Sequence, residues 1–188
     1  MVKENIKKFW KFLQEDTWQS WLVSMIIIIV LIKFIFFPTL SWITGSPLPL
    51  VVVESCSMYH NADFENWWDA HAALYMQYNI TKSDFQSYIF QNGLNKGDVI
   101  LVWSKSTYNI GDVIIFNAGT QYPIIHRVVT APNLSTKGDN NGGQLSEEKT
   151  ISPNQIVGKG IFHIPLIGWL KLIFYEPFRP ADQRGFCH

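Results

Sequence analysis

Residues 51–60 read Val-Val-Val-Glu-Ser-Cys-Ser-Met-Tyr-His, a run of valines that leads into two serines one residue apart. Three consecutive valines are typical of a buried strand. Because side chains alternate along a strand, Ser55 and Ser57 are predicted to share one side and Cys56 to face the other. One hydroxyl can then attack a substrate while the second donates a hydrogen bond to the developing oxyanion. Serines at a strand end are also common turn residues, so this motif needs support from the rest of the chain.

The composition sets limits on the class of protein. The 188 residues suffice for one sizeable domain, or for a small domain and an anchor. Lys+Arg and Asp+Glu both number 15, so the basic bias expected of a nucleic-acid-binding protein is missing from the sequence. Two such distant cysteines, Cys56 and Cys187, are no disulfide framework, and the sequence leaves open whether they form a bridge with each other. The five histidines are scattered, and neither a metal site nor a cofactor is predicted.

A membrane anchor is predicted near the N-terminus. Residues 18–37 are almost all apolar, and as a helix they would span about 30 Å, the hydrocarbon thickness of a bilayer. Pro38 is expected to end that helix, which gives a transmembrane segment at 18–38. A cleaved signal peptide is the alternative, but the span is long for one and no clear small-x-small cleavage site follows it.

The charges around the span predict its orientation. Four lysines lie in residues 1–17, and no charged residue lies between the span and Glu54. The positive-inside rule therefore puts residues 1–17 in the cytoplasm and residues 39–188 outside it. Glycosylation sequons at Asn79 and Asn133 both fall in the part predicted to be external.

The external part is predicted to be mainly β, an antiparallel catalytic domain with a small helical insertion at about 61–95. Within the insertion, residues 65–78 read as a helix, and a capping box at 81–84 begins a second one. Trp67 and Trp68 either enter the membrane interface or pack on the core, and both alternatives stay open. Further strands are expected at 97–103 and 111–116, each after a Gly-Asp turn, and at 122–130 and 155–164, while 135–143 is read as a strand end that enters a tight turn.

The C-terminal region is harder to assign. Residues 161–174 are apolar but short for a second span, so an interfacial or core segment is expected, with a second transmembrane helix as the alternative. The tail from Arg179 onward is expected to be mobile.

A serine hydroxyl needs a base that takes its proton, and His126 is the best candidate because histidine exchanges protons near neutral pH. A half-buried structural histidine is the alternative reading. A third group must orient the imidazole, and Asp139, in a Gly-Asp-Asn-Asn turn, can supply it unless it only serves the turn. Should His126 not serve, Lys137 and Lys159 are the next candidates, as the base of a Ser–Lys dyad.

Three residue sets thus follow one membrane span in order: Ser55-x-Ser57-Met58, then Gly111 to Phe116 with His126-Arg127-Val128, then Lys137 to Asn141. This order resembles type I signal peptidases of the archaeal and endoplasmic-reticulum type, the Ser-His-Asp branch of peptidase family S26. In that branch the base is a histidine where the bacterial branch has a lysine. The resemblance runs from about Val52 to Gly168, with the segment 61–95 as an insertion.

The resemblance implies a role for each matching residue. Ser57 matches the nucleophile, His126 the general base and Asp139 the acid. Ser55, together with the backbone N–H of Ser57, matches the oxyanion hole, and Met58 is expected to contact substrate. The family is known for a β-rich catalytic domain with shallow pockets for small side chains, and it needs no cofactor.

One departure from the family pattern concerns the acid. Many relatives carry a further Asp shortly after the Gly-Asp-Asn run, but here residues 142–145 read Gly-Gly-Gln-Leu. Glu147 and Glu148 follow, in what is expected to be a solvated loop. Either Asp139 acts alone or one of these glutamates replaces the missing acid.

The sequence therefore predicts a membrane-anchored serine endopeptidase that removes N-terminal signal peptides from secreted preproteins. Its expected partners are signal peptides, the lipid bilayer and other membrane subunits, with no nucleic acid. Its expected location is an archaeal cell membrane or the endoplasmic-reticulum membrane, with a single span. The alternatives are an inactive anchored relative that binds secretory peptides, and another anchored Ser–His hydrolase.

Overall fold

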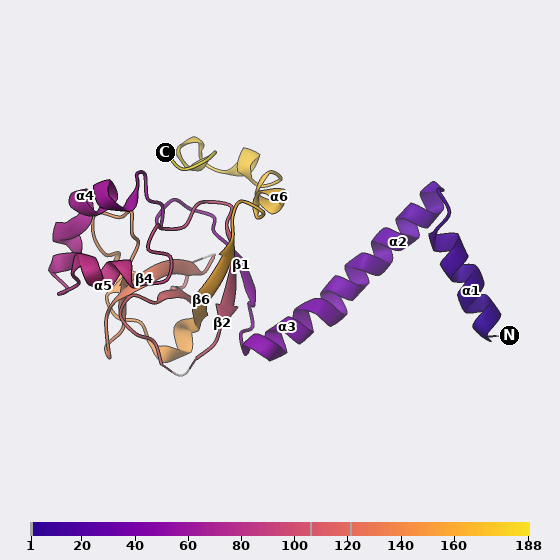
Figure 1. Ribbon diagram of the computed structural model, residues 1–188, viewed down its shortest axis with the longest axis horizontal. Coiled ribbons are helices and arrows are strands. Elements are labelled where there is room, and N and C mark those ends of the chain that lie inside the picture. The colour runs from indigo at the N-terminus through magenta and orange to yellow at the C-terminus, as the bar shows by residue number, and fades with distance from the viewer. Residues whose placement is uncertain (1, 106, 121) are drawn as a thin grey trace. The chain divides into compact units, whose positions relative to one another are not determined.

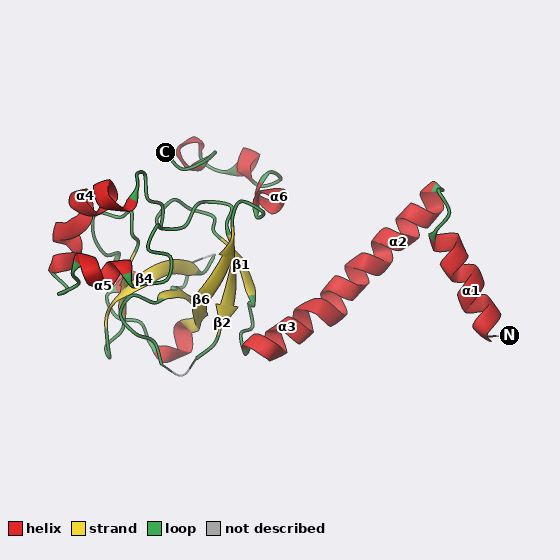
Figure 2. Ribbon diagram, viewed as in Figure 1, coloured by secondary structure: helices red, strands yellow, loops and turns green. Residues whose placement is uncertain are grey.

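The computed structural model describes residues 2–105, 107–120 and 122–188. The chain forms two compact units, residues 1–43 and residues 44–188 (Figure 1). The first unit is helical, whereas the strands of the described chain lie in the second (Figure 2). The candidate site residues, which lie between 55 and 159, also belong to the second unit.

The first unit begins with helix α1, Val2–Leu13. After a short turn, the Thr17 hydroxyl caps the next helix by accepting the N–H of Ser20. Three segments then follow without a break: α2 (Trp18–Leu31), a π-helical turn η1 (Ile32–Phe36) and α3 (Phe37–Thr44). By length and composition, this run of 27 residues can cross a membrane.

The prediction that Pro38 ends the helix is wrong, because the helix continues to Thr44. A proline inside a helix lacks one N–H, and its ring collides with the preceding turn. Here the turn before the proline is π-helical, and the N–H of Phe37 bonds to the carbonyl of Ile32, five residues back. Such local widening lets apolar helices keep a proline.

The second unit is built on a six-stranded antiparallel sheet, which confirms the predicted fold class. The strand order is β1-β2-β6-β3-β4-β5. The strands are β1 (Leu50–Val52), β2 (Val99–Trp103), β3 (Val113–Phe116), β4 (Ile124–Thr130), β5 (Ser135–Lys137) and β6 (Ile156–Ile164).

Both predicted Gly-Asp turns precede strands. Gly97 and Gly111 have φ values of 93° and 92°, in the region that favours glycine. The next residue closes each turn, since Asp98 accepts the N–H of Asn95 (2.9 Å) and Asp112 that of Asn109 (3.0 Å).

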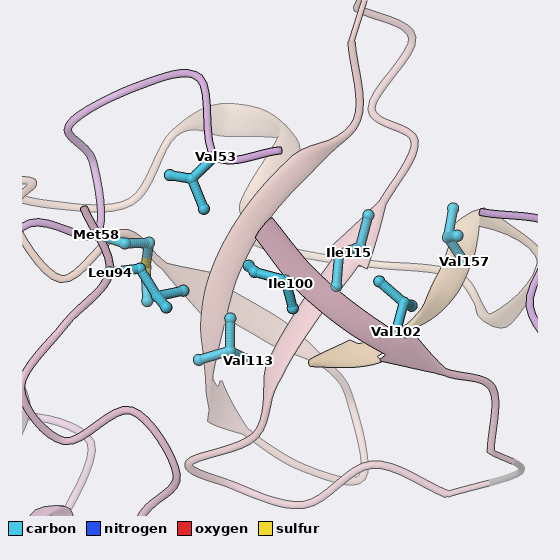
Figure 3. Close-up of a cluster of buried hydrophobic side chains, with 8 residues drawn as sticks. All are labelled: Val53, Met58, Leu94, Ile100, Val102, Val113, Ile115 and Val157. Carbon is cyan, nitrogen blue, oxygen red and sulfur yellow. The ribbon is translucent and has the colours of Figure 1, made fainter. Parts of the chain in front are cut away.

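The core lies on the sheet and includes two residues that flank the serine motif. Figure 3 shows the eight buried side chains of one hydrophobic cluster in this core: Val53, Met58, Leu94, Ile100, Val102, Val113, Ile115 and Val157. Val53, two residues before Ser55, and Met58, directly after Ser57, are therefore held in the hydrophobic interior, which fixes both ends of the short serine segment.

The helical insertion contains α4 (Phe64–Met76) and α5 (Lys82–Gln86), and the predicted capping box at Thr81 begins α5. Figure 1 shows both helices beside β4. Trp67 and Trp68 are buried in an aromatic cluster that also contains Val129 of β4. Of the two alternatives for these tryptophans, packing on the core is the one observed.

After β5 the chain forms two 3₁₀ turns, η2 (Ser146–Glu148) and η3 (Pro153–Gln155). After β6 come the four-residue helix α6 (Trp169–Leu172) and two more 3₁₀ turns, η4 (Glu176–Phe178) and η5 (Ala181–Gln183). Within the described ranges, only the helix in residues 18–44 is long and apolar enough to span a membrane, so no second spanning helix forms at 161–174. Cys187, in the tail that was expected to be mobile, is joined to Cys56 by a disulfide.

Candidate active site

The two serines lie together in a turn. Strand β1 ends at Val52, and the N–H of Tyr59 bonds to the carbonyl of Cys56 (3.1 Å), which closes the turn. The Oγ atoms of Ser55 and Ser57 are 3.1 Å apart. They are therefore brought together by the turn and not by the strand alternation that the sequence suggested. Ser55 is exposed and Ser57 half-buried, so a substrate can reach both hydroxyls.

The serine turn rests on the Gly-Asp-Asn segment that follows β5. Asn140 donates its backbone N–H to the carbonyl of Ser57 (2.8 Å) and its side-chain amide to the carbonyl of Cys56 (3.1 Å). A Cβ on Gly138 would lie 2.7 Å from Nε2 of His126 and 2.9 Å from the carbonyl oxygen of Ser57. The imidazole of His126 and the backbone of Ser57 thus border one small space, which only glycine leaves open.

His126 is held from its other side by a carboxylate. Its strand β4 pairs it with Ile114 in the sheet, and its side chain is buried. Nδ1 bonds to Oε1 of Glu148. A carboxylate on Nδ1 keeps the proton on that nitrogen, so Nε2, which faces Gly138, is left as the proton acceptor.

Glu148 is fixed by further hydrogen bonds. Its side chain is fully buried. Oε1 also accepts the hydroxyl of Thr136 (3.2 Å), and Oε2 accepts the N–H of Leu145 (2.7 Å). A buried carboxylate with this many donors has one orientation, and it therefore fixes the imidazole that bonds to it.

Asp139 does not bond to His126, contrary to the pairing that the sequence predicted. Its Oδ1 accepts the Tyr75 hydroxyl (2.7 Å) and Nε of Arg127 (3.0 Å). Its Oδ2 accepts Nη2 of Arg127 (2.7 Å) and bonds to Nε2 of His60 (3.1 Å). The physical reason is strand alternation, because Arg127 follows His126 on β4 and the two side chains leave opposite faces of the sheet.

The Asp139–Arg127 pair is buried completely. Burial alone would raise the pKa of Asp139, but the Arg127 guanidinium and the hydrogen bond from His60 hold it well below its usual range. Arg127 also donates to three backbone carbonyls, those of Ile89, Phe90 and Gly111. This ion pair therefore joins the helical insertion to the sheet next to the site.

His60 is the other partner in this network. Its ring stacks on Trp67 at 3.5 Å between centroids. Within the described part of the chain, its Nδ1 has no hydrogen-bond partner. Burial lowers the pKa of His60 in spite of the neighbouring Asp139 carboxylate, because a second ring proton would be buried without an acceptor.

The predicted substrate-contact residue and the two alternative bases are all held by contacts within the domain. Met58 is 1% exposed in the core, which leaves almost no surface for the predicted contact with substrate. Lys137 is buried and donates to the carbonyl of Gly138 (2.9 Å), and burial lowers its pKa. Lys159 pairs with Asp112 (2.7 Å).

The prediction that both glutamates of the polar loop are solvated is wrong for one of them. Glu147 is exposed, as expected, but Glu148 is not solvated. The available signal was its place in the turn, since it is the third residue after Leu145 and returns to that backbone N–H as in a capping box.

No protein-family model matches the chain. The chain is 27% identical to "Signal peptidase complex catalytic subunit SEC11" of Chaetomium globosum over 158 residues, which cover 76% of this chain and 73% of that protein. A protein of the same name from Saccharomyces cerevisiae is 36% identical over 96 residues, 43% of this chain and 58% of the yeast protein. The matched region thus spans less than two thirds of the yeast relative. These similarities agree with the resemblance that the sequence motifs indicated.

Proposed function

Because this chain is a homologue of endoplasmic-reticulum-type signal peptidase catalytic subunits, we propose that it is a membrane-anchored serine endopeptidase that removes N-terminal signal peptides from preproteins. One observation supports the proposal above all others. The Ser57 backbone and Nε2 of His126 border the same space at Gly138, while Glu148 holds the other nitrogen of the imidazole. This is the order of groups that a Ser-His-acid hydrolase requires.

In the first step, Oγ of Ser57 attacks the scissile carbonyl carbon, and Nε2 of His126 accepts the hydroxyl proton. The new C–O bond leaves a negative charge on the former carbonyl oxygen. The Ser55 hydroxyl and the backbone N–H of Ser57 donate hydrogen bonds to that oxygen. The Glu148 carboxylate stabilises the imidazolium without taking the proton itself.

In the second step, the C–N bond breaks and His126 gives its proton to the leaving amine, which is the new N-terminus of the mature protein. The signal peptide stays on Ser57 as an ester. A water molecule then transfers a proton to His126 and attacks the ester carbonyl. The C–O bond to Ser57 breaks and His126 returns the proton to Oγ, so that the signal peptide leaves with a new C-terminal carboxyl group and the serine is restored.

We assign the orienting acid to Glu148 instead of Asp139. Its carboxylate bonds to Nδ1 of His126, whereas Asp139 is taken up by Arg127, His60 and Tyr75. This assignment also weakens the alternative of an inactive relative, whose support was the missing second aspartate.

The proposed location is the endoplasmic-reticulum membrane, with residues 44–188 on the lumenal side. The lysines before the apolar helix support this orientation. The Cys56–Cys187 disulfide supports it independently, because disulfides persist in oxidising compartments such as the lumen. The names of the relatives include the word complex, so other membrane subunits are proposed as partners.

The experiment is cleavage of a preprotein by the full-length chain in detergent, together with any subunits that copurify. Mass spectrometry should detect one released N-terminal peptide. Ser57→Ala should abolish the reaction, and Ser55→Ala should lower kcat by about 10²–10³, the loss typical of one oxyanion donor. A fully active Ser57→Ala protein would reject the proposed function.

A further inference from the structure

The last residues of the chain return to the serine turn. We define residues 176–188 as the C-terminal strap; it contains the turns η4 and η5. Cys187 in this strap is bonded to Cys56, the residue between the two serines, across 131 positions of sequence. The strap is therefore linked covalently to the proposed nucleophile segment.

A second attachment lies one residue before Ser55. Arg179 donates from Nη1 to the backbone carbonyl of Glu54 (2.9 Å) and from Nη2 to its carboxylate (2.5 Å). Lys171, just before the strap, donates to the other carboxylate oxygen of Glu54 (2.9 Å). Arginine that contacts a carbonyl and a carboxylate at once fixes position as well as charge.

The strap is itself fixed to the body of the domain. Lys96, 1% exposed, donates to Glu176 (2.9 Å) and to the carbonyl of Gln183 (2.7 Å). The rings of Trp169 and Phe186 lie 4.5 Å apart. The strap can therefore act as a fixed support on which the serine turn is held.

The serine turn is also held by Asn140, which donates to the carbonyls of Cys56 and Ser57. The turn is thus held by both the Gly-Asp-Asn segment and the strap. Ser55 nevertheless remains exposed and Ser57 half-buried. A strap that blocked the site would cover these hydroxyls, so this arrangement fits support and not inhibition.

We propose that the C-terminal strap is a positioning element of the active site. Cys187 and Arg179 hold residues 54–56, so that the Ser57 hydroxyl stays within reach of His126 and the Ser55 hydroxyl faces the oxyanion. This inference rests on the proposed function and deepens it. Because misplacement of a reacting group by 1 Å can cost about 10² in rate, release of the strap lowers kcat.

The test compares the full-length chain before and after treatment with a dithiol reductant. The reductant is oxidised to its own disulfide, while Cys56 and Cys187 each gain a proton and become thiols. We expect kcat for preprotein cleavage to fall by about 10- to 100-fold, with KM nearly unchanged. Cys187→Ala should show the same loss and no further response to reductant. Asp182→Asn, an exposed change in the same strap, is the matched control and should keep wild-type kcat.

Three results decide the proposal. A kcat that stays within about twofold after complete reduction would overturn the strap and leave the proposed peptidase intact. Loss of activity that follows thermal unfolding of the reduced chain would also overturn it, because the bridge would then only stabilise the fold. If the oxidised wild-type chain cleaves no preprotein, the proposed function itself fails, and the strap has no reaction to support.

Discussion

Replacement of Glu148 by Gln tests the assignment of the orienting acid most sharply. In the fully buried carboxylate, Oε2 accepts the N–H of Leu145 and Oε1 accepts Nδ1 of His126. A glutamine has one carbonyl oxygen and one NH₂ group. If the oxygen stays on Leu145, the NH₂ group faces Nδ1, so the imidazole must carry its proton on Nε2 and can no longer accept one from Ser57.

The magnitude follows from this geometry. A catalytic histidine in the wrong tautomer costs about 10⁴ in kcat in the serine proteases where the carboxylate was changed to an amide. If the amide flips instead, its NH₂ group meets the N–H of Leu145, and a buried unsatisfied donor costs about 1–3 kcal/mol of stability. We therefore expect kcat to fall by about 10³–10⁴ with at most this modest loss in stability.

The comparison is Asp139→Asn, which removes the charge from a buried pair and leaves Arg127 without its counter-ion. Breaking such a pair typically costs about 3–5 kcal/mol, so we expect a large loss of stability and a much smaller loss of kcat in the folded fraction. The assay is preprotein cleavage with urea unfolding of each variant, and Glu147→Gln, an exposed change, is the control. A Glu148→Gln enzyme within about tenfold of wild type, beside a folded but inactive Asp139→Asn, would refute this assignment.

Three further outcomes are expected. Burial lowers the pKa of His60, so the unfolded chain binds a proton on this side chain more readily than the folded chain does. The urea midpoint should therefore fall as the pH drops below 6.5, and His60→Gln should flatten this dependence. An unchanged slope in His60→Gln would contradict this prediction. Gly138→Ala should lower kcat by about 10² or more, because the new methyl would lie 2.7 Å from Nε2 of His126; wild-type kcat would show that the space is not used. In sealed microsomes, protease added outside should leave residues 44–188 intact, whereas digestion of that unit would reverse the proposed orientation.

Much of the fold could be predicted from local sequence patterns. The Gly-Asp turns at Gly97 and Gly111 correctly predicted the strands that follow them. Glycine conformation and aspartate side-chain hydrogen bonds are local, since they act within a few residues. Runs of apolar residues predicted the strands and the long helix, because such runs are also a local property of the sequence. The end of that helix at Pro38 was misjudged, because one π-helical turn accommodates the proline.

The candidate site was predictable in its residue types but not in all of its pairings. Ser57 and His126 belong to recognisable local motifs. The partner of the imidazole depends on which face of β4 each side chain leaves, and that is decided by the register of the sheet. Asp139 therefore pairs with Arg127. The imidazole of His126 bonds instead to Glu148, which lies in a loop whose polar composition predicted exposure to solvent. The Cys56–Cys187 bridge could likewise not be decided from the sequence, because the two cysteines lie 131 positions apart.

The proposed mechanism requires that Ser57 carries the signal peptide as an ester during turnover. The direct measurement is the mass of the intact chain after rapid mixing with a preprotein and acid quenching, followed by peptide mapping. We expect a mass gain equal to the acylating signal peptide less one water, located on Ser57 and absent from Ser57→Ala. Cleavage by Ser57→Ala at the wild-type rate, or an adduct on any other residue, would contradict it.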